Sequence, residues 1–302
     1  MPLIQTFRRR AFTIDAAALI AVAGAAVQLY QWSRARPMWV DEEMIAINLR
    51  ERSLVDMPGR LLLEMNAPLG WMALQRTWLV AFGTSELALR FVPVVIGIGT
   101  LAAGVWMGRR WLGPFGAALL VALCATGAWL SFYSLELKHY SADICLGLLL
   151  PGLAAWTLEA DAPASRRRVW TWWAVASAGL WFAYGAAFVV PASAAVIVLV
   201  VWRRHGWREA VAAAAPGLLW AAALGLHYMT TIRHATGSAF LTNYWAFRCL
   251  RHRRAWRTRF AGSPIKWSRP PSSRAAPRTR CSSGWLSASG GSCSFAPTAH
   301  SD

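Results

Sequence analysis

The stretch LALRFVPVVIGIGTLAAGVWM, from Leu87 to Met107, contains a single charged residue, Arg90. A helix needs about 20 predominantly apolar residues to cross the roughly 30 Å hydrocarbon core of a bilayer, and this stretch is long enough. A surface helix of a soluble domain would instead carry a polar face that returns at every turn. The stretch therefore predicts a transmembrane helix.

Other blocks of the same character follow one another along the chain. They are Ile14–Trp32, Pro114–Phe132, Asp143–Leu158, Val169–Tyr184, Ala186–Trp202 and Ala210–Thr231. The 302 residues are 56% hydrophobic and only 15% charged, which is less charge than a soluble domain usually carries. We predict an all-α, polytopic membrane protein with about seven transmembrane helices. The first block follows Arg8–Arg10 without a small-residue cleavage site, so we expect a retained signal anchor.

A further block, Pro68–Phe82, is short and has Gln75 and Arg76 at its centre. A central arginine costs on the order of 3 kcal/mol in a spanning helix. If this block does not span, the basic clusters of the loops all fall on one side, the cytoplasm, as the positive-inside rule requires. These clusters are Arg8–Arg10, Arg109–Arg110, Arg166–Arg168 and the group of Arg203, Arg204 and Arg208. We therefore predict a juxtamembrane helix inside a long first extracytoplasmic loop, from about Ser33 to Ser85, in a multi-pass protein of the cell membrane.

The character of the chain changes near residue 247. Residues 248–302 contain ten Arg, one Lys and one acid, and so contribute +10 to the net charge of +17. We divide the chain into a transmembrane module, residues 1–246, and a basic tail rich in Ser, Pro and Arg, residues 247–302, whose composition predicts disorder. A tail that binds anionic lipid or nucleic acid is one explanation, and a reading-frame error in a GC-rich gene is the one we favour. The remaining charge fits the positive-inside rule, so no nucleic-acid partner is expected. The cysteines show no CxxC spacing, which supports neither a metal site nor a disulfide framework.

The stretch WVDEEMIAINLRERS, from Trp39 to Ser53, places the carboxylates Asp41, Glu42 and Glu43 soon after the first apolar block. One interpretation is a solvated acidic loop. The other is a carboxylate held near the membrane and partly desolvated, which raises its affinity for protons. Such a group suits a general base that acts on an acceptor hydroxyl or amine.

The segment EMNAPLGWMALQRTWLVAFGTSELALR, from Glu64 to Arg90, contains a turn at Asn66 and the start of the next apolar block. Thr84 or Ser85 is positioned to cap that helix. Arg90 lies one turn inside it and either snorkels to the surface or binds a lipid phosphate, since its planar fork can contact two oxygens.

The segment YSLELKHYSAD, from Tyr133 to Asp143, is the third candidate. Helical spacing would place Tyr133, Glu136 and Tyr140 near one face, with His139 close by. Ionisable residues at this membrane boundary, on the same side as Asp41, suggest one shared cavity. We expect His139 to be a polar partner rather than a catalyst.

The order of these segments resembles a known family. A signal-anchor helix, an Asp-Glu pair, a turn ending in Pro-Leu, the segment FGTSELALRFVPVVIGIGT, a basic loop and YSLELKHYSAD follow one another from about Phe12 to Tyr244. This arrangement is similar to the C-superfamily membrane glycosyltransferases that use polyprenol-phosphate sugars. The protein O-mannosyltransferases and the bacterial aminoarabinose transferases of lipid A belong to that superfamily.

The resemblance implies roles for individual residues. Asp41 would be the catalytic base, with Glu42 completing the pair, and Arg90 would contact the donor phosphate. Asn66 stands where the family often has His or Lys, so the basic or imidazole group is missing there. The family's YS-x-E-x-K/R-x-Y segment would place Tyr133, Ser134, Glu136, Lys138 and Tyr140 at the substrate.

The implied function is transfer of a sugar from a polyprenyl-phosphate donor to an extracytoplasmic lipid, glycan or protein, with inversion at the anomeric carbon. Donor, acceptor and membrane lipids would be the partners. No cofactor is implied with certainty, although a carboxylate pair could hold a divalent cation, and no complete ligand set is visible. The alternatives are an inactive, truncated fragment of such an enzyme and a transporter. A transporter should show paired inverted repeats and broken spans, which this sequence does not.

Overall fold

The computed structural model describes residues 15–160 and 162–236, and every regular element in that part of the chain is helical. Within these described residues, five segments are long and apolar enough to cross a membrane: Ala16–Ser33, Glu86–Thr126, Tyr140–Leu158, Ala186–His205 and Trp207–Ile232. The chain is thus an all-α protein with the helices of a multi-pass membrane protein. The predicted basic tail, residues 247–302, lies outside the described residues.

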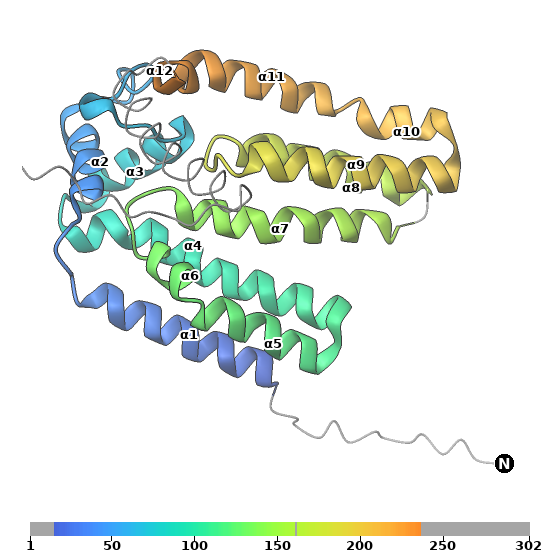
Figure 1. The fold of residues 1–302 in the computed structure, drawn as a ribbon, viewed down its shortest axis with the longest axis horizontal. Helices are drawn as coiled ribbons and strands as arrows, with labels where there is room; N and C mark the ends of the chain where they lie inside the picture. Colours follow the sequence, from blue (N-terminus) through green and yellow to red (C-terminus); the bar gives the residue numbers. More distant parts are fainter. Residues whose placement is uncertain (1–14, 161, 237–302) are drawn as a thin grey trace, which may run out of the picture. The chain divides into compact units, whose positions relative to one another are not determined.

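The helices run alongside one another over most of the described chain (Figure 1). The longer ones are α1 (Ala16–Ser33), α3 (Leu69–Phe82), α4 (Glu86–Met107), α5 (Gly113–Thr126), α7 (Tyr140–Leu158), α8 (Ala162–Gly179) and α9 (Ala186–His205). The shorter ones are α2 (Val40–Glu51), η1 (Leu62–Glu64), η2 (Gly108–Leu112), α6 (Ala128–Tyr133), α10 (Trp207–Ala214), α11 (Gly217–His227), η3 (Tyr228–Ile232) and α12 (Arg233–Thr236).

Helices α1, α4, α7 and α9 match predicted blocks to within three residues at each end. The Ser85 hydroxyl caps α4 as expected, since it accepts a hydrogen bond of 3.2 Å from the Ala88 N–H.

Three other predicted blocks were wrong in their bounds. Gly127 divides Pro114–Phe132 into α5 and α6, and Pro216, which has no N–H to donate, divides Ala210–Thr231 into α10 and α11. Val169–Tyr184 is displaced, because α8 starts at Ala162 and ends at Gly179. Helix α8 is not among the five apolar segments.

The 41-residue apolar segment Glu86–Thr126 folds back on itself. Gly113 adopts a φ of 70°, a conformation that favours glycine, and the chain reverses there between α4 and α5. A Cβ atom on Gly108 would lie 2.5 Å from the Cα of Ala117, so α4 and α5 touch through small residues. Such residues let membrane helices approach closely.

The junctions between α4 and α5 and between α9 and α10, and the first turns of α8, lie at one end of the bundle (Figure 1). These segments contain Arg109, Arg110, Arg166, Arg203 and Arg204. Four contacts tie the connections together: Arg109 with Asp15, Arg110 with Glu159, Arg166 with Glu209, and Arg204 with the carbonyl of Leu158. Helices α2 and α3 and the α6–α7 connection lie at the opposite end. The separation of the two ends is the one that the loop charges predicted.

Residues 40–51 form a helix, α2, where the sequence was interpreted as part of a loop. Asp41, Glu42 and Glu43 occupy its first turn, where negative charge complements the helix dipole. The Trp39 N–H, which has no carbonyl partner within the helix, donates to Glu42 Oε2 at 3.1 Å. The acidic run is therefore also a helix-start signal.

Helix α3 begins directly after Pro68 and has 14 residues, too few to span a bilayer. The Arg76 guanidinium donates to the carbonyls of Leu49 at 2.7 Å and Arg50 at 3.3 Å. These are carbonyls of the last turn of α2, which have no partner within that helix. Arg76, the residue that made this segment ambiguous, thus provides hydrogen-bond donors for the C-terminal end of α2.

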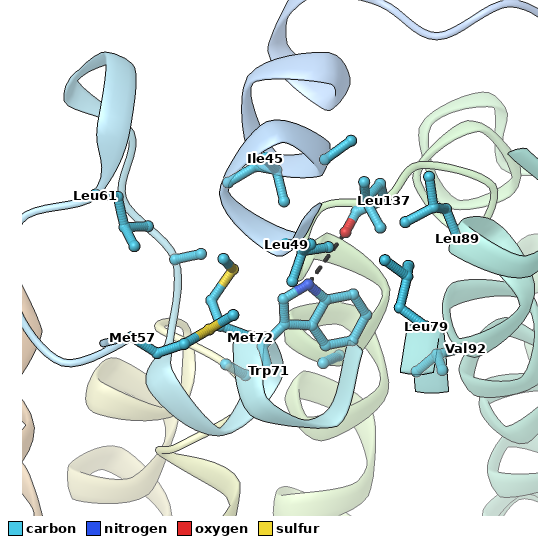
Figure 2. Close-up of a cluster of buried hydrophobic side chains, with 14 residues drawn as sticks. Ile45, Leu49, Met57, Leu61, Trp71, Met72, Leu79, Leu89, Val92 and Leu137 are labelled. Atoms are coloured by element: carbon cyan, nitrogen blue, oxygen red, sulfur yellow. Dashed lines mark hydrogen bonds between the residues drawn. The ribbon is translucent and has the colours of Figure 1, made fainter. Parts of the chain in front are cut away.

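A hydrophobic cluster joins α2, α3 and α4 to the α6–α7 connection (Figure 2). At its centre, the fully buried indole of Trp71 donates to the carbonyl of Leu137 at 3.1 Å. The side chains around it include Ile45, Leu49, Met57, Leu61, Met72, Leu79, Leu89 and Val92. Removing each such Leu, Ile or Met side chain from water contributes roughly 1.5–3 kcal/mol. The cluster therefore fixes the α6–α7 connection against the start of α2.

Candidate functional site

A pocket of about 310 Å³ lies between the start of α2 and the α6–α7 connection. Its lining residues are Trp39, Val40, Asp41, Phe132, Tyr133, Glu136, Lys138 and Tyr140. Its volume is at the lower end of the range for small-molecule sites. Five residues that the sequence singled out, Asp41, Tyr133, Glu136, Lys138 and Tyr140, meet in this one pocket.

Asp41 and Lys138 form an ion pair inside the pocket, with 2.7 Å between Asp41 Oδ2 and Lys138 Nζ. The side chain of Asp41 is 67% exposed, whereas that of Lys138 is 12% exposed. Burial would lower the pKa of Lys138, but the hydrogen bond and charge of Asp41, together with the interaction with Tyr140, outweigh it and the pKa is raised. The pocket therefore holds a permanent positive charge, and its present partner is a carboxylate that solvent reaches.

Glu136 is the other acid of the pocket, and the residue is only 8% exposed. Within the described part of the chain its carboxyl group has no hydrogen bond and no ion pair. Burial, followed by the negative charge of Glu42, raises the pKa of Glu136, although Arg36 and Lys138 oppose the change.

Aromatic rings form the apolar wall of the pocket. The rings of Tyr133 and Tyr140 meet edge to face with centroids 4.7 Å apart, and Trp129 stacks on Tyr133 at 5.7 Å. The Lys138 ammonium lies 5.5 Å from the centroid of Tyr140. Rings with fixed orientation beside charged groups are typical of sites that bind an amphipathic ligand.

The backbone around Glu136 and Lys138 is not helical, so the predicted helical face was wrong. Residues 134–139 form consecutive turns between α6 and α7. The intervening Leu137 is held on both sides: its N–H donates to Glu42 Oε1 at 3.0 Å, and its carbonyl accepts from Trp71. Because Leu137 is fixed in the core, Glu136 and Lys138 on either side of it are placed at the pocket.

Glu42 and Arg90 do not line the pocket but form a buried pair next to it. Arg90 Nε and Nη2 donate to Glu42 Oε1 at 2.9 Å and to Oε2 at 2.7 Å. Arg90 also donates to the carbonyls of Arg36 and Pro37. Burial would raise the pKa of Glu42, but hydrogen bonds from Arg90, Leu137 and Trp39 outweigh it and lower the pKa. The Arg90 guanidinium, which the sequence suggested as a ligand for a lipid phosphate, thus already donates to Glu42.

The carboxylate that neutralises Arg90 is Glu42, 48 positions away in the sequence. Arg90 is 3% exposed and its side chain joins α4 to the segment that enters α2. The pair ties α4 to the first turn of α2, which also contains Asp41.

Arg36 and Phe132 are neighbours of the site that sequence reasoning missed. The Arg36 guanidinium lies 4.9 Å from the ring centroid of Phe132 and 3.8 Å from Glu42 Oε2. Arg36 Nη2 is buried and has no hydrogen-bond partner. The only signal in the sequence was a basic residue in the segment that joins α1 to α2.

Asn66 is separate from the pocket. Its Oδ1 accepts a hydrogen bond of 2.6 Å from the hydroxyl of Tyr184, whose ring packs on His139 with centroids 4.9 Å apart. His139 lies 3.5 Å from Asp143, in line with the predicted role of polar partner. Burial, with the charge of Lys138 and the proximity of His227, lowers the pKa of His139 to about 3, so the imidazole is neutral.

Comparison of the chain with protein-family models, with curated proteins and with solved structures finds no match. Among the described residues, no group of three or more His, Cys, Asp or Glu side chains is arranged to hold a metal ion.

Proposed function

We propose that this chain is an integral membrane glycosyltransferase. It would move a sugar from a polyprenyl-phosphate donor to an extracytoplasmic acceptor, with inversion. One observation carries the proposal: a pocket that pairs a buried lysine with an exposed carboxylate lies beside aromatic rings, at the end of the bundle opposite the arginines. The family resemblance of the sequence supports the same function.

The proposed topology has seven crossings. The Glu86–Thr126 segment folds back between α4 and α5. Helix α4 is one crossing, and α5 together with α6, which follows it after Gly127, is the next, because α5 alone is too short. Helix α8 is counted as a crossing although it is less apolar than the others. The arginine-rich end then faces the cytoplasm, as the positive-inside rule requires. The pocket opens on the other side of the membrane, where a lipid-linked sugar can approach it from the outer leaflet.

Lys138 is the cation that meets the donor phosphate in this proposal, in place of Arg90. An ammonium group acts on a phosphate as a point charge and needs no fork geometry. Its present partner, Asp41, is solvent-exposed, so a phosphate can replace that carboxylate with little rearrangement. Donor binding thereby releases Asp41 for use as a base.

The transfer is a single displacement. A lone pair of the acceptor oxygen or nitrogen attacks the anomeric carbon while Asp41 takes the acceptor's proton. The bond between the anomeric carbon and the phosphate oxygen breaks, and its electron pair stays on the phosphate, which Lys138 stabilises. Attack opposite to the leaving group inverts the configuration of the anomeric carbon.

The test uses the full 302-residue chain in proteoliposomes with three radiolabelled donors, the decaprenyl-phosphate esters of mannose, glucose and arabinose, and with a cell-envelope extract as the source of acceptor. We expect release of decaprenyl phosphate from at least one donor, and strong loss of that release in Lys138→Met. A matched control is Arg50→Met, which removes the exposed cation paired with Glu43 away from the pocket. No release by the wild-type chain with any donor would favour the alternative of an inactive fragment.

A further inference from the structure

The charges around the pocket are balanced in pairs, with one acid left over. Asp41 pairs with Lys138 and Glu42 pairs with Arg90. Glu136 has neither a hydrogen bond nor an ion pair in the described part of the chain, although more than nine-tenths of the residue is buried and it lines the pocket.

The charge of Arg36 does not resolve this imbalance. Arg36 is stacked over Phe132, and its Nη2 lies 3.8 Å from Glu42, so its charge is shared with another carboxylate. Arg36 is also absent from the pocket lining.

We propose that the pocket binds a phosphodiester together with one proton, and that Glu136, as the neutral acid, donates an O–H hydrogen bond to a phosphate oxygen beside Lys138. The inference deepens the proposed function and rests on it, since it takes the ligand of this pocket to be a prenyl phosphodiester. It adds a binding residue and a coupling between pH and donor affinity.

The physical reason is electrostatic. A phosphodiester brings one negative charge to a pocket where Asp41 and Glu136 are already present and water is partly excluded. An ionised Glu136 would repel the phosphodiester, whereas the protonated carboxyl group can donate a hydrogen bond to a phosphate oxygen. The Lys138 ammonium alone cannot neutralise two carboxylates and a phosphate.

The groups that face Glu136 favour the neutral form. Asp41 and Glu42 face it from α2, and both disfavour a further negative charge. Arg36, which precedes α2, and Lys138, which lies with Glu136 in the α6–α7 connection, favour the ionised form of Glu136. Tyr133 and Tyr140 complete the surroundings in the pocket. Burial is the largest influence, and the raised pKa of Glu136 agrees with the geometry.

The experiment measures binding of methyl farnesyl phosphate, a short prenyl phosphodiester, to the full chain in nanodiscs. A phosphodiester has no second ionisation, so its charge stays constant across the titration. If Glu136 must be protonated, affinity falls as pH rises above the pKa of Glu136 in the free protein, by up to about tenfold per pH unit.

Glu136→Gln should bind the probe with an affinity that no longer varies with pH, because the amide is always neutral and still donates a hydrogen bond. The matched control is Glu43→Gln, which removes an exposed carboxylate of α2 outside the pocket and should keep the wild-type pH dependence. A Glu136→Gln protein that retains the wild-type pH dependence would overturn the inference.

A second measurement needs no variant. Calorimetry of probe binding to the wild-type chain, in two buffers with different ionisation enthalpies, counts the protons taken up per ligand. We expect uptake that approaches one proton as the pH rises above the pKa of free Glu136. Binding without proton uptake at every pH would overturn the role of Glu136 and leave the proposed function standing. No binding of the probe at any pH would overturn both.

Discussion

Glu42 and Arg90 face each other through two hydrogen bonds of 2.9 and 2.7 Å while being 0% and 3% exposed. The pair joins the first turn of α2 to α4, and Glu42 also accepts a hydrogen bond from the Leu137 N–H. One buried carboxylate therefore connects three segments that are distant in the sequence. Asp41, the next residue along α2, owes its position in the pocket to this pair.

Breaking the Glu42–Arg90 pair should destabilise the protein strongly. Arg90→Met leaves a buried carboxylate without its partner, at a cost of about 3–5 kcal/mol. Glu42→Gln leaves the guanidinium uncompensated and should cost a similar amount. The double variant should cost clearly less than the sum of the single variants, because neither charge is then left alone. Chemical denaturation in detergent measures all three.

The exposed pair of Arg50 and Glu43 is the matched control for this cycle. Its side chains are 33% and 43% exposed, and water can replace each lost partner. Removing either residue should change stability by less than about 1 kcal/mol. Additive losses at Glu42 and Arg90 would contradict the view that the two residues act as one unit.

The spans could be predicted because apolar length is a local property of the sequence. Blocks such as Leu87–Met107 and Ala186–Trp202 correspond closely to α4 and α9. The breaks at Gly127 and Pro216 were missed because hydropathy alone is insensitive to a single residue that ends a helix. Helix α2 was missed because its acids were considered either as a solvated loop or as a catalytic base, and not as residues of a first helical turn.

Five of the predicted site residues line the pocket, whereas Glu42, Arg90 and Asn66 lie outside it. The pocket residues came from two short segments, and their charge and aromatic content marked them out. The partner of Arg90 could not be found, because Glu42 lies 48 positions away and pairing of that kind depends on tertiary structure. The same holds for Tyr184, which binds Asn66 across 118 positions.

Asp41→Asn should abolish sugar transfer and leave expression and folding intact. The amide keeps the shape of the side chain but cannot accept the acceptor's proton. Because the side chain is 67% exposed, its neutralisation should cost little stability. Turnover of the donor that the wild-type chain accepts is the measurement, with Glu43→Gln as the neighbouring control. Equal rates for Asp41→Asn and wild type would remove Asp41 from the mechanism.

The topology predicts which positions an impermeant thiol reagent reaches from outside the cell. In a background without the native cysteines, a cysteine at Val55, which is 86% exposed near the pocket end, should be labelled from outside. A cysteine at Arg167 or Arg110, at the arginine-rich end, should be labelled only after the membrane is permeabilised. External labelling at position 110 would contradict the seven-crossing arrangement.

His139 should make the protein less stable in acid. Its pKa of about 3 in the folded chain lies below the ordinary value of 6.5, since burial, Lys138 and His227 all disfavour the charged ring. Between these two pKa values, His139 is protonated in the unfolded chain and neutral in the folded chain. Stability should fall as the pH is lowered from about 6.5 to about 3, and this contribution should be constant above that range. The apparent melting temperature in detergent, measured against pH, shows the effect.

Replacing the imidazole tests that assignment. His139→Gln removes the titrating group but keeps a polar side chain beside Asp143 and Tyr184, so the acid-side loss of melting temperature should become shallower. His205→Gln, at an exposed position at the end of α9, should leave the wild-type profile unchanged. Glu42 adds acid sensitivity of its own, because its lowered pKa makes the Arg90 pair lose stability as the carboxylate is protonated. A profile that is identical in His139→Gln and wild type would assign the whole acid loss to carboxylates.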